Sequence, residues 1–169
     1  MKKRNGFTLV ELLAVIVVLA IIMIIAIPAI LDVMNNARKS SFVLYVEKVV
    51  GATQTQYMYD ANGGPLKGAG VYVYNIETDL NLTTTGSYRG YVVVDATVVD
   101  KPVYHVFLHD DNYQVIGASV SDANTMPTAS DVKAYVQSEF ASAAGDELKA
   151  CGTAHRDVNC YNRLGYQYQ

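Results

Sequence analysis

The side chains that most often carry out enzymatic chemistry are few and scattered in this sequence. Its three histidines are His105, His109 and His155. His105 and His109 fall in a run of β-forming residues, where four residues span about 13 Å, too far for a shared metal ion. Asp110 and Asp111 suit a turn and lack the ligand spacing of an EF-hand loop. We therefore predict no catalytic site, no metal site and no cofactor, and do not expect an enzyme.

One carboxylate lies in an apolar setting. Glu11 is the one acidic or basic residue between Phe7 and Leu31. The twenty uncharged residues of Leu12–Leu31 would span about 30 Å as a helix, enough to cross a bilayer. A carboxylate costs about 2.5–3.5 kcal/mol at the bilayer centre and less near the membrane surface. By itself, Glu11 is either a tolerated residue near the headgroups or a functional group.

The residues before the apolar run set its orientation. Lys2, Lys3 and Arg4 favour a cytoplasmic N-terminus, with the chain after Leu31 on the other side of the membrane. The run is too long for a cleaved secretory signal, whose apolar core has about 7–15 residues. Leaving out the three cations changes the formal charge from −3 to −6, so no specific nucleic-acid partner is predicted. An uncleaved signal anchor explains this pattern but not Glu11.

The segment Gly6–Glu11 reads GFTLVE and follows the short basic leader. Together with the apolar run, it resembles the signal of type IV prepilins, which is shared by the pseudopilins of type II secretion and DNA uptake. The resemblance implies that a membrane peptidase removes residues 1–6 by cutting between Gly6 and Phe7, and then methylates the Phe7 amine. Residues 7–31 would stay on the mature protein as its transmembrane and fibre-core segment.

The same resemblance assigns roles to other residues of this segment. It implies that Glu11, together with Thr8, aligns subunits during assembly, because the Glu11 carboxylate pairs with the Phe7 amine of a neighbouring subunit. A wrong register would leave both charges unpaired in a medium of low dielectric constant. Pro28 matches the position at which the helix of the family kinks, and proline lacks the amide proton that a helix needs there.

The helical pattern continues beyond the apolar run. Residues 32–61 contain no proline and are predicted to form an amphipathic half of the same helix. The stretch Asn62–Gly70 ends the helix, and it lacks the Gly-Lys-Ser/Thr sequence of a phosphate-binding loop. The apolar face of the amphipathic half comprises Phe42, Tyr45, Val46, Val49, Val50, Thr53 and Tyr57.

Residues 62–169 are predicted to form a globular, β-rich head. A hairpin turn is expected at residues 109–112, and a second helix over about 128–150 because Thr128 and Asp131 fit a capping box. The expected fold class is therefore α+β: a long N-terminal helix packed on a small antiparallel sheet of three or four strands, with an additional C-terminal helix, as in pilins. The β-forming segments are Tyr72–Tyr74, Tyr91–Val94, Val103–Leu108 and Tyr113–Ser119.

The two cysteines, Cys151 and Cys160, lie near the C-terminus. Under the orientation above both are outside the cytoplasm, where a disulfide can form, although in an anaerobe both could stay free thiols. Pilins often hold their C-terminal region with a disulfide, so the resemblance favours a bond between them. The enclosed loop is shorter than that comparison leads one to expect.

The resemblance implies a structural subunit of a type IV pilus (fimbrium), a surface filament linked to adhesion and motility. Its expected partners are further copies of itself, minor pilins, the prepilin peptidase and methyltransferase, an assembly platform with a separate ATPase, and membrane lipid before assembly. The chain would be a single-pass protein of the cytoplasmic membrane and then part of an extracellular filament. Two alternatives stay open: a pseudopilin, and an uncleaved signal-anchored extracytoplasmic binding domain.

Overall fold

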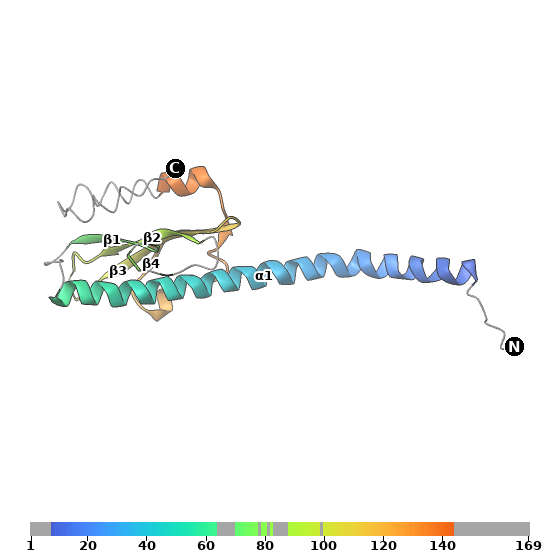
Figure 1. Cartoon of the computed structure of the whole chain (residues 1–169), viewed down its shortest axis with the longest axis horizontal. Coiled ribbons are helices and arrows are strands. Elements are labelled where there is room, and N and C mark those ends of the chain that lie inside the picture. Colours follow the sequence, from blue (N-terminus) through green and yellow to red (C-terminus); the bar gives the residue numbers. More distant parts are fainter. Residues whose placement is uncertain are drawn as a thin grey trace. The chain divides into compact units, whose positions relative to one another are not determined.

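A computed structural model describes residues 8–63, 70–77, 79–80, 82, 88–98 and 100–143 of the chain (Figure 1). One long helix is followed by an antiparallel sheet and a short C-terminal helix at residues 137–143, which confirms the α+β class. The chain divides into two compact units between Arg38 and Lys39. The elements are α1 (Leu9–Gly63), β1 (Val71–Asn75), β2 (Arg89–Asp95), β3 (Val103–His109), β4 (Tyr113–Val120), the 3₁₀ turn η1 (Ala123–Thr125) and β5 (Lys133–Ala134).

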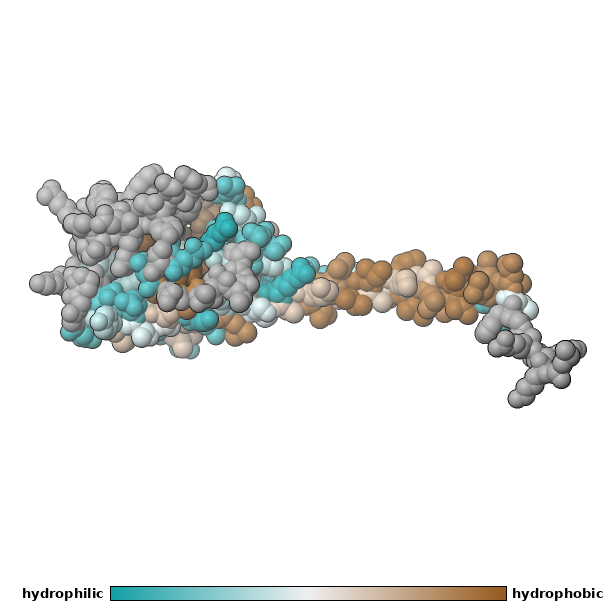
Figure 2. Space-filling model, in the orientation of Figure 1, coloured by the Kyte–Doolittle hydropathy of each residue, from teal (hydrophilic) through white to brown (hydrophobic). Residues whose placement is uncertain are grey.

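The first unit contains the apolar part of α1. The helix continues through Pro28, and its length and composition would let it cross a membrane. Figure 2 shows this part as an almost uninterrupted hydrophobic surface. Leu9 is 80% exposed, Ile24 74% and Leu19 48%, so the apolar side chains have no cover within the unit. A surface of this kind requires lipid or other protein around it.

The second unit contains the amphipathic half of α1, and the predicted apolar face is confirmed. Phe42, Val46 and Tyr57 are buried together with side chains of the sheet. On the opposite side of the helix, Leu44 and Glu47 are exposed. Residues spaced three and four apart thus bury one stripe of the helix and leave the other outside, as an amphipathic pattern requires.

The sheet has five strands in the order β1-β2-β3-β4-β5, all antiparallel, where the sequence predicts three or four. The predicted turn at residues 109–112 is confirmed: the Asp110 carboxylate accepts hydrogen bonds from the backbone N–H groups of Asn112 (2.7 Å) and Tyr113 (2.6 Å). The additional strand is β5, whose two residues pair with Tyr113 and Gln114 of β4. Two residues are too short to show the alternating pattern by which strands are recognised.

The expected helix start at Thr128 is wrong. The Asp131 carboxylate does accept hydrogen bonds from the backbone N–H and the hydroxyl of Thr128, both at 2.8 Å, but they close a turn instead of opening a helix. Val132 is buried in the core, and the chain then pairs with β4. Tertiary pairing thus overrides the local capping signal, and the helix starts at residue 137. The predicted end near residue 150 lies outside the described residues.

Both faces of the sheet are apolar. One face packs on α1, and the other carries a second cluster of Val73, Tyr91, Val93, Phe107 and Phe140. The continuous apolar runs of β1, β2 and β3 fit this arrangement, because a strand buried on both faces does not alternate between polar and apolar residues.

A buried carboxyl group ties the end of α1 to the sheet. Asp60, 5% exposed, accepts hydrogen bonds from the Tyr74 hydroxyl of β1 (2.9 Å) and from Gln56 on its own helix (3.0 Å). Buried polar groups are stable when they are hydrogen-bonded in this way. The sequence gives no periodic signal for such a contact, because it joins residues of two different elements.

Candidate functional site

The described start of α1 joins Thr8 and Glu11, the two residues to which the prepilin resemblance assigns a role in subunit assembly. The backbone N–H and the hydroxyl of Thr8 both donate to Oε2 of Glu11, each at 2.9 Å. In return, the backbone N–H of Glu11 donates to Oγ1 of Thr8 at 3.3 Å. Thr8 is therefore the N-cap of α1 and Glu11 its third helical residue, which is the reciprocal geometry of a capping box.

This geometry gives Glu11 a fixed place at the first turn of the helix. The free N–H groups and the macrodipole make the start of a helix favourable for a negative charge. The capping box therefore holds the Glu11 carboxylate next to the point where the chain enters α1. The Thr-x-x-Glu spacing before an apolar run is the signal by which the sequence could have shown that Thr8 caps this helix.

We predict that Thr8→Ala loosens the start of α1. The substitution removes the hydroxyl and its bonds with Glu11, and loss of an N-cap costs about 1 kcal/mol. Hydrogen exchange of the amides near Glu11, measured in detergent micelles, should therefore become about fivefold faster. Thr8→Ser keeps the hydroxyl and should exchange like the wild type. Equal exchange in the alanine variant and the wild type would contradict the capping role.

Several predicted site residues lie outside the described part of the chain. They are Gly6 and Phe7, the expected cleavage and methylation positions, and the two cysteines, Cys151 and Cys160. Cleavage, methylation and the disulfide therefore stay predictions. Pro28 lies within α1, and its role as a kink is also still a prediction.

Two of the three histidines, His105 and His109, lie in the described part of the head. His105 Nδ1 lies 3.0 Å from the Ser119 hydroxyl, as a cross-strand pair on β3 and β4. His109 lies at the end of β3, against aromatic rings. Among the described residues, no three His, Cys, Asp or Glu side chains gather as metal ligands.

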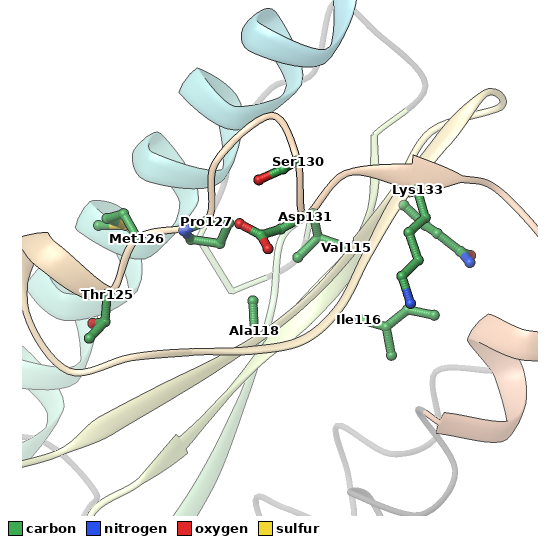
Figure 3. A pocket seen from close by; sticks show the side chains of 10 residues that line it. Val115, Ile116, Ala118, Thr125, Met126, Pro127, Ser130, Asp131 and Lys133 are labelled. Atoms are coloured by element: carbon green, nitrogen blue, oxygen red, sulfur yellow. The ribbon is translucent and has the colours of Figure 1, made fainter.

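A cavity of about 380 Å³ lies between β4 and the segment that leads to β5 (Figure 3). Its lining includes Val115, Ile116, Met126 and Pro127, with Asp131 among the polar groups. Hydrogen bonds from the backbone and side chain of Thr128 lower the pKa of Asp131. The Asp131 carboxylate is therefore already engaged in holding the turn.

Comparison with known proteins identifies the N-terminal segment. The family described as the prokaryotic N-terminal methylation motif matches residues 1–27, which include Thr8 and Glu11. No curated protein and no solved structure matches the chain. The matched motif is a structural motif of the pilin type and does not define an enzyme family. Residues 1–27 therefore carry the class III signal peptide that is found in type IV pilins and pseudopilins.

Proposed function

We propose that this protein is a pilin, a structural subunit of a type IV pilus. A prepilin peptidase would cleave the chain between Gly6 and Phe7, and the Phe7 amine would be methylated. The observation that carries the proposal is the methylation motif at residues 1–27, which includes the start and most of the apolar part of α1.

The exposed side chains of this part of α1 support assembly. Because they have no cover within their own unit, they must lie in lipid before assembly and against other subunits afterwards. Packing the helices of several subunits side by side removes the same surface from water. Membrane anchoring and filament assembly thus use one surface in succession.

The capping box supports a role for Glu11 in subunit register. Its carboxylate is held at the first turn of α1 by Thr8, so it is presented in a fixed position. Cleavage would create a positive amine at Phe7, four residues before Glu11. An ion pair between this amine and Glu11 of a neighbouring subunit penalises every register that leaves the two charges apart.

The orientation and the partners follow from this proposal. Lys2, Lys3 and Arg4 favour a cytoplasmic leader, so the peptidase would act at that face, and the head would lie outside the cytoplasm. Export into a surface filament requires an assembly platform with a separate ATPase. Minor pilins would share the filament with copies of this chain.

Immunogold electron microscopy with an antibody against the head tests the proposal. A pilin should be labelled along the length of surface filaments and recovered in the sheared fraction. A pseudopilin shares the same N-terminal motif, but it should stay in the membrane fraction. Label confined to the membrane would overturn the assignment to a surface pilus and favour the pseudopilin.

A further inference from the structure

His109 joins the sheet to the C-terminal helix through aromatic contacts. Its ring stacks on that of Tyr135, with a centroid distance of 4.4 Å and an interplanar angle of 8°. The ring of Phe140 meets it edge to face, at 4.6 Å and 68°. His109 closes β3, whereas Tyr135 follows β5 and Phe140 lies in the helix at residues 137–143.

These contacts hold residues 135–143 against one face of the sheet. Phe140 belongs to the same buried cluster as Val93 and Phe107, and Tyr135 packs against that cluster. Further described contacts attach this segment to the sheet and the turn. They include the two-residue strand β5, the hydrogen bond from the Tyr135 N–H to the Asn112 carbonyl oxygen (3.0 Å), and the bonds of the Gln114 side chain to the Val136 N–H (3.2 Å) and to Glu139 (3.3 Å).

The charged groups around His109 come from several elements. Arg89 is its cross-strand partner on β2, and Asp110 and Asp111 follow it in the turn. Its partner on β4 is the neutral Gln114, whose side chain donates to Glu139 of the helix. Tyr135, which stacks on His109, adds a titratable phenol group.

The surroundings of the His109 ring favour its neutral form. Its Nδ1 lies 3.3 Å from the carbonyl oxygen of Asp110, which can only accept, so Nδ1 carries the proton and Nε2 is the site of protonation. Burial lowers the pKa of His109, and the positive charge of Arg89 lowers it further. The Asp110 carbonyl and the carboxylates of Asp110 and Asp111 act in the opposite direction, and the net pKa is below its ordinary value.

We propose that protonation of His109 releases residues 135–143 from the sheet, so that the head uncovers one of its faces in mild acid. A cationic ring would be desolvated beside Arg89, and this cost is relieved when the aromatic segment separates and water reaches the ring. The inference does not depend on filament assembly, because every group that it uses lies in the head.

The sign of the pH dependence follows from linkage. Because the docked state lowers the pKa of His109, it favours the neutral ring. The contribution of His109 to the docking free energy is complete above the pKa of a free histidine, about 6.5, and is lost as the pH falls through the lower pKa of the docked state. At neutral pH the segment should therefore be docked.

Hydrogen exchange followed by mass spectrometry, on the full-length protein in detergent micelles, tests the proposal. Exchange at about pH 7.5 is compared with exchange at about pH 5, after scaling for the intrinsic effect of pH. Peptides covering residues 135–143 should lose protection several-fold in acid, while β3 keeps its protection. His109→Phe, whose ring cannot be protonated, should remain protected at both values.

Two further variants complete the test. His109→Gln is neutral at every pH and should show no acid-dependent loss, even if its protection is lower throughout. His105→Gln is the matched control, because His105 lies on the same strand away from Tyr135 and Phe140, and it should respond to acid like the wild type. Equal protection of the wild type at both pH values, or the same loss in both His109 variants, would overturn the proposal. The first result would mean that attraction between a charged ring and Tyr135 outweighs desolvation.

Discussion

Replacing Glu11 with valine should leave the leader cleaved and Phe7 methylated, but should prevent recovery of the chain in surface filaments. The substitution makes the apolar run continuous, so membrane insertion is retained. Assembly would then bury the Phe7 amine without its carboxylate partner. Leaving a buried charge unpaired costs about 3–5 kcal/mol, which corresponds to about a hundredfold loss of assembly or more.

The control for Glu11→Val is Glu77→Val, because it makes the same chemical change at an exposed position of the head. It should be processed and assembled at close to the wild-type level. Western blots of membrane and sheared fractions report the amount of chain in each, and mass spectrometry reports processing. Normal filaments from Glu11→Val would contradict the proposed role of Glu11 in assembly.

Replacing Gly90 with alanine should unfold the head or destabilise it severely. Gly90 has φ +145°, a conformation that residues with a side chain rarely adopt. A Cβ atom at this position would overlap the carbonyl oxygen of Phe107 and lie 3.1 Å from Cα of Leu108, both on the paired strand β3. Because the obstacle is backbone in the centre of the sheet, it cannot move aside, and we expect a loss of about 3–5 kcal/mol.

Gly51→Ala provides the matched control on helix α1. Gly51 is exposed, and an added Cβ would meet nothing within 4 Å. Alanine has the higher helix propensity, so this variant should be more stable by about 0.5–1 kcal/mol. Thermal unfolding followed by the near-ultraviolet signal of the tyrosines measures both variants. A Gly90→Ala protein as stable as the wild type would contradict the described pairing of β2 with β3.

Periodicity made much of this fold predictable. The stripe from Phe42 to Tyr57 recurs at helical spacing, and the structure buries this stripe. Four strands appear within one or two residues of their predicted ends, because β-branched and aromatic residues gather in them and turn residues separate them. These signals are local, so they can be recognised in the sequence before the partner of each element is known.

Contacts between distant residues were not predictable in this way. The capping pattern of Thr128 and Asp131 is present, but pairing of β5 with β4 decides the path of the chain after it. The stacking of His109 on Tyr135 joins two segments that show no common pattern. Such features depend on the tertiary arrangement, which overrides local preference.

The candidate site was predictable in its residue types rather than in its geometry. The single charge in an apolar run makes Glu11 conspicuous, and the basic leader favours a cytoplasmic N-terminus. The bonds that link Glu11 to Thr8 are visible only once the first turn of the helix is in place. The proposed pairing of Glu11 with an amine would involve two subunits, so a single chain cannot display it.

Mass spectrometry of the N-terminus, on the chain isolated from membranes and from sheared surface material, tests the central claim most directly. The account predicts a protein that lacks residues 1–6 and begins with N-methylated Phe7 in the surface material. An intact leader in both fractions, starting at Met1 or Lys2, would contradict it and identify an uncleaved signal-anchored protein instead.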